Sequence, residues 1–190
     1  MRNIISFMHV SLDGFVAGPA GEMNWIKVDE EIFDHVGKRV RETDAALYGR
    51  VTYDMMESYW PDAGKEPDAS KHDRDHSAWY NGAHKFVMSR SMKGTELPNS
   101  TIISDNLAER INVLRQSDGS EILLFGSPTA THALMEQGLI DGYWLFVNPV
   151  ILGQGIPLFA GIPDKTALKL QSTQPFKNGV TELNYTVERS

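Results

Sequence analysis

The stretch that most constrains the fold is residues 123–131, Leu-Leu-Phe-Gly-Ser-Pro-Thr-Ala-Thr, where a short apolar run ends in a turn and continues as a helical pattern. This is typical of a buried strand that passes directly into a helix. The first N–H groups of a helix lack partners within it and carry partial positive charge, so they favour phosphate. Many such junctions bind nothing, so further evidence from the chain is needed to assign a site.

The same alternation of strand and helix extends over most of the chain. It predicts strands at 4–10, 45–48, 85–88, 101–104, 121–125 and 143–147, with helices at 29–40, 51–59, 105–114 and up to 137. Two last strands, 168–172 and 180–188, are joined through Asn178-Gly179, a strong hairpin signal. We therefore expect one α/β domain over residues 1–190, with three layers (α/β/α) and a mixed, mostly parallel sheet that ends in an antiparallel hairpin. Glu182 and Asn184 should lie on a solvent-facing side of the last strand.

Residues 61–80 differ in character from the rest. They are polar and contain Pro61, Gly64 and Pro67, so the pattern indicates a long surface loop. Loops of this length are commonly functional or mobile. Asp29 and Asp105 precede helical patterns, and both are predicted to be N-caps.

The composition excludes several kinds of protein. The chain has 190 residues, 41% hydrophobic and 23% charged, as in an ordinary globular domain. It contains no cysteine, which excludes disulfides, thiolate metal sites and a cysteine nucleophile. A net charge of −7 argues against nucleic-acid or anionic-membrane partners. The first apolar run reaches Asp13 too soon for a signal peptide, and no run approaches a membrane span, so we expect a cytoplasmic protein.

Two further turns resemble the first, because each follows the end of a predicted strand and carries groups that can contact phosphate. Gly49 ends a strand, and Arg50, Val51 and Thr52 begin the next helix, where an arginine can make bidentate bonds to phosphate. Ser89-Arg90-Ser91 ends another strand with two hydroxyls and a guanidinium. Each is also consistent with an ordinary surface turn. Three such turns at one sheet edge would form a dinucleotide crevice, although none matches G-x-G-x-x-G, so this is not a standard Rossmann domain.

In their order along the chain, four motifs resemble the dihydrofolate reductase-like superfamily. They are Ser11-Leu12-Asp13-Gly14, Gly49-Arg50-Val51-Thr52-Tyr53, Val87-Met88-Ser89-Arg90 and Phe125-Gly126-Ser127-Pro128-Thr129. Residues 134–141 and 148–159 are similar to one branch, the reductase domain of riboflavin-biosynthesis deaminase-reductases and its stand-alone relatives. The resemblance covers nearly the whole chain.

The resemblance implies a dihydrofolate reductase-like fold and an NADPH-dependent reductase, active on a pterin- or pyrimidine-like heterocycle or a carbonyl compound, and homodimeric. It assigns the adenine-side phosphates of NADPH to Gly49, Arg50, Val51, Thr52, Ser89 and Arg90. It assigns the pyrophosphate to Gly126, Ser127, Pro128 and Thr129, and places Val16 and Ala17 beside the nicotinamide. The region 143–147 and the terminal hairpin are expected dimer contacts.

Two departures from the family pattern leave the substrate open. Phe15 stands where riboflavin-pathway enzymes have lysine, which argues against a phosphoribosyl-pyrimidine. Trp25 and Glu30 keep the spacing of tryptophan and acid in dihydrofolate reductases, but the proline between them is missing. Gly126-Ser127 also replaces the Gly-Gly of many members.

The candidate proton donors or substrate anchors are the carboxylates Asp13, Asp29 and Glu30. Asp29 and Glu30 are equally consistent with helix capping, and Asp13 with a simple Asp-Gly turn. His9 and Trp25 are candidate substrate contacts, or packed structural residues.

Two other functions stay open from the sequence. A non-catalytic NADP- or pterin-binding module would keep the crevice without turnover. A metal-dependent enzyme would use the His72/His76 loop, where Asp73, Asp75 and His84 add potential ligands.

Overall fold

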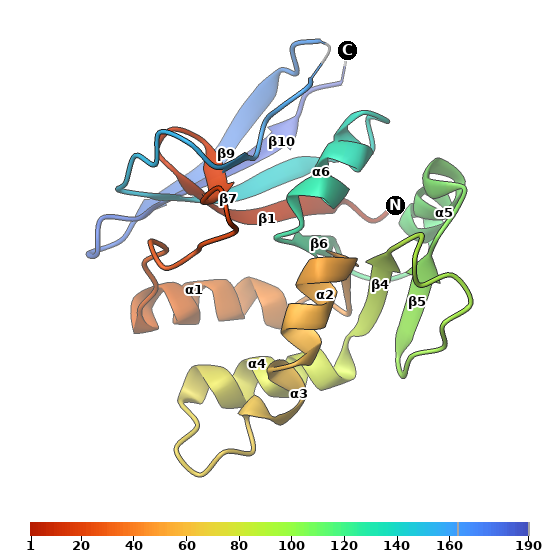
Figure 1. Cartoon of the computed structure of the whole chain (residues 1–190), viewed down its shortest axis with the longest axis horizontal. Coiled ribbons are helices and arrows are strands. Elements are labelled where there is room, and N and C mark those ends of the chain that lie inside the picture. The colour runs from red at the N-terminus through yellow and green to blue at the C-terminus, as the bar shows by residue number, and fades with distance from the viewer. Residues whose placement is uncertain (163, 190) are drawn as a thin grey trace.

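The protein, seen in a computed structural model that describes residues 1–162 and 164–189, is built on an eight-stranded sheet. The strand order is β5-β4-β3-β6-β1-β7-β10-β9 (Figure 1). All neighbours from β5 to β7 are parallel, whereas β10 is antiparallel to β7 and to β9. The strands of this sheet are β1 (Ile4–Ser11), β3 (Ala45–Gly49), β4 (His84–Met88), β5 (Ser100–Ile103), β6 (Ile122–Phe125), β7 (Gly142–Asn148), β9 (Leu168–Pro175) and β10 (Thr181–Val187). The predicted mixed sheet with a terminal hairpin is confirmed.

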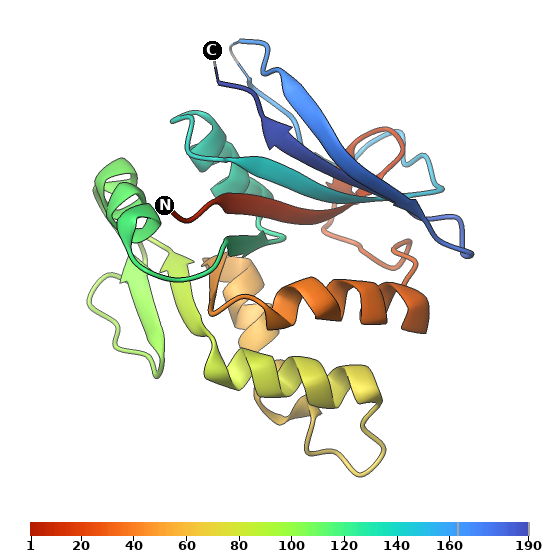
Figure 2. The same cartoon turned by 180° about the vertical axis from the view of Figure 1, so that it is seen from behind.

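Helices cover both faces of the sheet, as the two opposite views show (Figures 1 and 2). Ile122 and Leu124 of β6 face one core, whereas Leu123 and Phe125 face the other. The first core is closed by α5 and α6 and the second by α1, α2 and α4. This is the predicted three-layer arrangement. The helices are α1 (Glu30–Arg41), α2 (Arg50–Glu57), α3 (Trp60–Ala63), α4 (Lys71–Gly82), α5 (Leu107–Gln116) and α6 (Pro128–Met135).

A small second sheet lies in the loops that follow β1 and β7. It pairs β2 (Phe15–Ala17) with β8 (Ile156–Pro157) in antiparallel orientation. Val16 and Ala17 are buried there. A Cβ at Gly155 would collide with the carbonyl oxygen of Ala17, so this close approach requires glycine.

The loop predicted over residues 61–80 is wrong, because most of it forms α3 and α4. Ser70 and Asp73 make a capping box: the Asp73 N–H donates to Ser70 Oγ at 3.1 Å, and the Ser70 N–H donates to Asp73 Oδ2 at 2.9 Å. The buried side chains of α4 are His76, Ser77 and Tyr80. Because this inner face is polar or aromatic instead of aliphatic, the sequence shows little helical hydrophobic periodicity.

The predicted cap at Asp105 is also wrong. Asn106 is the N-cap residue of α5, in the left-handed region at φ 47°, without a side-chain cap bond. Asp105 instead forms ion pairs with Lys93 at 3.1 Å and Arg110 at 3.4 Å. At α1 the prediction is confirmed, since Asp29 Oδ1 accepts a hydrogen bond from the Ile32 N–H at 3.0 Å.

Two expectations about the last strands need correction. Glu182 is buried and paired with His35 of α1, because α1 covers the side of β10 that was expected to face solvent. Residues 143–146 of β7 are buried between β1 and β10 within a single chain, so they are not available as dimer contacts. In the terminal hairpin, β9 is an edge strand with exposed residues from 169 to 175.

Within the described part of the chain, no helix combines the length and apolarity that crossing a membrane requires.

Candidate functional site

The three predicted phosphate turns lie at the carboxyl ends of β4, β3 and β6, which are consecutive strands of the sheet. Because these strands are parallel, their carboxyl ends share one edge. Ser89 and Arg90 follow β4, Gly49 ends β3 ahead of Arg50, Val51 and Thr52, and Gly126 to Thr129 follow β6. The structure therefore brings together the residues that the sequence suggested separately. This edge is where open α/β sheets bind ligands.

A hydroxyl links two of these turns. Ser127 Oγ accepts a hydrogen bond from the Gly49 N–H at 2.8 Å and donates one to the Phe125 carbonyl oxygen at 2.9 Å. Gly126 and Ser127 both have left-handed backbones, with φ of 53° and 60°, and Pro128 is the first residue of α6. A Cβ at Gly126 would lie 3.4 Å from Thr52 Cγ2, and one at Gly49 would lie 3.3 Å from Ser127 Cβ. The two turns thus pack against each other with little room to spare.

The outer part of this edge carries the cations. Arg50 is half-exposed and pairs with Asp54 at 2.8 Å, one helical turn along α2. Arg90 is exposed, and its neighbour Ser89 accepts a hydrogen bond from the Met92 N–H at 3.3 Å. Val51 is 71% exposed, so the helix start has no neighbouring layer above it. These groups are accessible to an anionic ligand.

His9 lies further along the same edge, near the end of β1. The Gly126 N–H donates to the Phe7 carbonyl oxygen at 3.0 Å, so β1 continues past the level at which β6 turns. His9 stacks on Phe146 of β7 with ring centroids 5.1 Å apart. Burial lowers the pKa of His9 to about 4, so its imidazole is neutral at pH 7.

Asn148 is a site residue that sequence reasoning missed. It ends β7, is fully buried, and accepts the Lys27 N–H at 2.8 Å through Oδ1. Its Nδ2 lies 3.1 Å from the Phe146 carbonyl oxygen and 3.4 Å from His9 Nδ1. Asn148 therefore joins β1, β7 and the loop that leads into α1. Its signals in the sequence are an amide directly after the apolar run 143–147 and its position at the start of the segment 148–159, which resembles the reductase branch.

Asp13 is held by the loop that follows β7. Its carboxylate accepts hydrogen bonds from Ser11 Oγ at 2.6 Å, the Leu152 N–H at 3.1 Å and the Gly153 N–H at 2.8 Å. The hydrogen bond from Ser11 is the main reason that the pKa of Asp13 lies below its ordinary value. An ionised carboxylate with its oxygens occupied suits the anchoring of a loop better than proton donation at neutral pH.

The other predicted substrate-side residues are placed by local contacts. Asp29 caps α1, and Glu30 is exposed in the first turn of the same helix. Trp25 is partly buried, and its Nε1–H donates to the Glu22 carbonyl oxygen at 3.0 Å. Their assignment as catalytic or substrate-binding groups stays a prediction.

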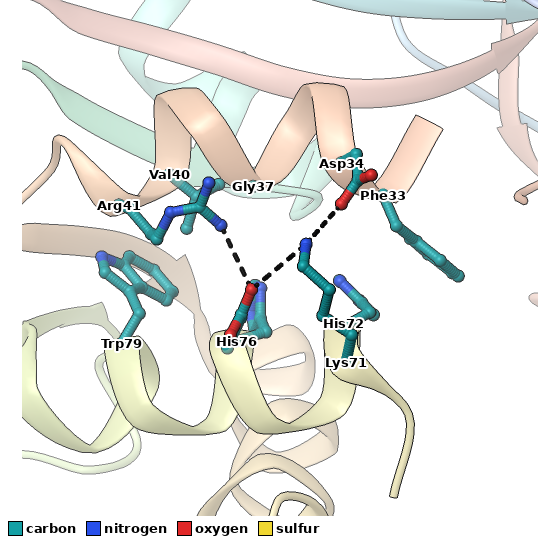
Figure 3. Close-up of a pocket in the computed structure, with 10 residues that line it drawn as sticks. Phe33, Asp34, Gly37, Val40, Arg41, Lys71, His72, His76 and Trp79 are labelled. Atoms are coloured by element: carbon teal, nitrogen blue, oxygen red, sulfur yellow. Dashed lines mark hydrogen bonds and ion pairs between the residues drawn. The ribbon is translucent and has the colours of Figure 1, made fainter. Parts of the chain in front are cut away.

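A cavity between α1 and α4 is lined by three residues of the metal hypothesis, His72, Asp75 and His76 (Figure 3). The ring of His72 stacks on that of Phe33 with centroids 3.9 Å apart, and the ring of His76 packs against that of Trp60 with centroids 4.0 Å apart. Asp75 lies 3.5 Å from both Arg41 and Lys71.

The remaining candidate ligands of that hypothesis are also engaged elsewhere. Asp73 belongs to the capping box, and His84 contacts Asn99 and Thr101. Nowhere in residues 1–162 and 164–189 do three histidine or acidic side chains come together as metal ligands.

Comparison with known proteins identifies the family. The sequence profile of the RibD C-terminal domain matches residues 2–181. The Bacillus subtilis (strain 168) protein YyaP is 33% identical over 187 residues, which cover 97% of this chain and 94% of YyaP. The chain belongs to the RibD C-terminal domain family. The matched family is of the reductase type, which supports an oxidoreductase kind for this RibD-type domain.

Solved structures agree with this RibD-type domain in fold. A pyrimidine reductase-like protein from Corynebacterium diphtheriae NCTC superposes with a TM-score of 0.68 at 16% identity, covering 100% of this chain and 93% of the other. Dihydrofolate reductase from Enterococcus faecalis, solved with NADP(H) and RAB-propyl, superposes with a TM-score of 0.64 at 12% identity, covering 98% and 97%. The dihydrofolate reductase-like fold is thereby confirmed.

Proposed function

We propose that this RibD-type domain is an NADPH-dependent reductase of a small heterocyclic or carbonyl substrate. The observation that carries the proposal is the hydrogen bond from the Gly49 N–H to Ser127 Oγ. It holds the turn after β3 against the turn after β6, so that both contribute to one surface at the edge of the sheet. NADPH would supply the hydride there. The chain's own residues bind and orient the dinucleotide and limit access of water.

The residues at this edge fit a dinucleotide phosphate. Gly126 to Thr129 present the amino end of α6, whose N–H groups and dipole suit a pyrophosphate. Arg50 and Arg90 supply exposed guanidinium groups for the additional 2′-phosphate of NADPH. Binding requires Arg50 to exchange Asp54 for phosphate, at small cost because the ion pair is exposed.

Titration of NADPH and NADH, followed by nicotinamide fluorescence, tests this assignment. We expect Arg50→Ala to weaken NADPH by about 10- to 100-fold, as for a lost hydrogen bond between charged groups, and NADH much less. Arg110→Ala is the matched control. Arg110 lies on α5, outside the set of residues proposed to bind NADPH, and like Arg50 it is half-exposed and paired with an aspartate, Asp105. Equal losses for both nucleotides would remove Arg50 from the 2′-phosphate site.

A second candidate is a binding module without turnover. It is favoured by the structural roles of Asp13 and Asp29, whose carboxylates are engaged in loop anchoring and helix capping. Quenching of nicotinamide fluorescence without oxidation of NADPH, across pterins, pyrimidines and quinones, would support this candidate over the reductase.

We further propose that the protein is a cytoplasmic homodimer. The exposed edge strand β9 is the part of the expected contact surface that a single chain leaves uncovered. Light scattering of the purified protein measures the oligomeric state directly, and a monomer at micromolar concentration would contradict the proposal.

A further inference from the structure

The orientation of the Asn148 side-chain amide is determined by its surroundings. The Lys27 N–H must donate, so the atom 2.8 Å from it is the amide oxygen. The other end of the amide faces the carbonyl oxygens of Phe146 at 3.1 Å and Val10 at 3.4 Å, which accept only. That end is therefore Nδ2, a donor.

This orientation determines which nitrogen of His9 carries the proton. Nδ1 of His9 lies 3.4 Å from Asn148 Nδ2, which can only donate, so a proton on Nδ1 would face another donor and Nδ1 is the unprotonated, accepting nitrogen. A neutral imidazole has one protonated nitrogen, and here it is Nε2. This contact is the one hydrogen bond of the His9 ring within residues 1–162 and 164–189, so Nε2–H is left to donate to another molecule.

The surroundings of His9 suit a flat ligand. The ring is partly exposed and is flanked by Phe146 and Phe7, with centroids 5.1 Å and 6.2 Å away. It lies one strand away from the Gly126 turn, at the edge that the dinucleotide is proposed to occupy. A planar heterocycle between the dinucleotide and His9 would meet a fixed hydrogen-bond donor.

We propose that His9 is a specificity-determining residue, held by Asn148 as the Nε2–H tautomer, which donates a hydrogen bond to a ring carbonyl oxygen of the heterocyclic substrate. The inference rests on the proposed function for the position of the substrate. The tautomer itself depends only on contacts within the chain. A neutral imidazole can polarise a carbonyl in this way without transferring its proton.

The tautomer is tested by long-range proton–nitrogen NMR of the whole protein labelled with ¹⁵N-histidine at pH 7. The His9 signals are assigned by their loss in His9→Gln. We expect a protonated Nε2 and an unprotonated Nδ1. A protonated Nδ1 would overturn the proposal, whether or not the protein binds NADPH.

The role in specificity is tested by titrating two fluorescent probes into the protein, with and without NADP⁺. The probes are pterin, which has a 4-oxo group, and 2,4-diaminopteridine, in which an amino group replaces it. We expect the wild type to prefer pterin and the His9 Nε2 signal to shift when pterin binds. No shift, or a preference for the diamino compound, would contradict a donor to a carbonyl.

Two substitutions separate the donor from the packing of the ring. Glutamine places an amide N–H near the position of Nε2, whereas asparagine reaches only the position of Nδ1. We expect His9→Gln to keep pterin affinity within about threefold, and His9→Asn to lose about 10- to 100-fold, in the range of one hydrogen bond to a desolvated group. Equal affinities for His9→Asn and wild type would overturn the role of His9. Absence of nucleotide binding with the pterin preference intact would overturn only the reductase proposal.

Discussion

Ser127 Oγ receives a hydrogen bond from the Gly49 N–H at 2.8 Å, so one hydroxyl holds the turn after β6 against the turn after β3. Both turns belong to the proposed NADPH site. The relationship makes the geometry of the site depend on a side chain that itself is buried.

Ser127→Ala removes this bond and leaves the Gly49 N–H without its partner. We expect a loss of about 1–3 kcal/mol of unfolding free energy, measured by urea denaturation, together with weaker NADPH binding. Ser127→Gly loses the same bond but relieves the left-handed backbone at φ 60°, so it should be about 1 kcal/mol less destabilising. A Ser127→Ala protein as stable as the wild type would contradict the role of this hydroxyl.

Asp13 provides a second test, through the loop that its carboxylate anchors. Asp13→Asn places an amide nitrogen against one of the two N–H donors of Leu152 and Gly153. We expect faster hydrogen exchange of residues 150–156 in this variant. In the wild type the pKa of Asp13 is lowered by folding, so the carboxylate stays ionised and the loop stays anchored at neutral pH. The same loosening should therefore appear only in acid, as the pH falls below the ordinary aspartate pKa and then through the lowered pKa of the folded protein. Exposed Asp118→Asn is the control and should leave exchange in the loop unchanged.

The buried histidines predict how stability depends on pH. Burial lowers the pKa of His76 to about 3 and that of His9 to about 4, both below the unfolded value near 6.5. The unfolded chain therefore binds more protons, and stability is lost as the pH falls below about 6.5. Between pH 7 and 5.5 we expect the two residues to lower the unfolding free energy by about 2 kcal/mol.

Replacement of His76 isolates its share of this acid sensitivity. His76→Phe keeps an aromatic ring against Trp60 and removes the titrating group. Urea denaturation at both pH values should show roughly half of the wild-type loss. An unchanged pH dependence in the variant would show that His76 is not protonated on unfolding.

The ion pairs of Asp141 show how burial determines the contribution of an ion pair to the unfolding free energy. It contacts buried Arg115 and half-exposed Arg189, each at 2.6 Å. Asp141→Ala leaves the Arg115 charge buried without its partner, so we expect a loss of about 3–5 kcal/mol in urea denaturation. Arg189→Ala should cost at most about 1 kcal/mol, because Arg189 is solvated and leaves Arg115 paired. Similar losses in the two variants would contradict this explanation.

The sequence by itself determined the features that depend on neighbouring residues. The strand-to-helix turns at Gly49 and Gly126, the cap at Asp29 and the Asn178-Gly179 hairpin follow from local propensity and capping, which act over a few residues. The order of the motifs along the chain also indicated the family. Helix α4 escaped prediction because its buried side chains, such as His76, are not aliphatic.

Only the tertiary structure decided how distant residues meet. His9 and Asn148 are 139 residues apart, and their contact depends on the parallel register of β1 and β7. The anchoring of Asp13 by Gly153 and the burial of Glu182 under α1 likewise require the strands and helices to be assembled. No local pattern encodes such contacts, because a shift of one residue in strand register turns every side chain to the opposite face of the sheet.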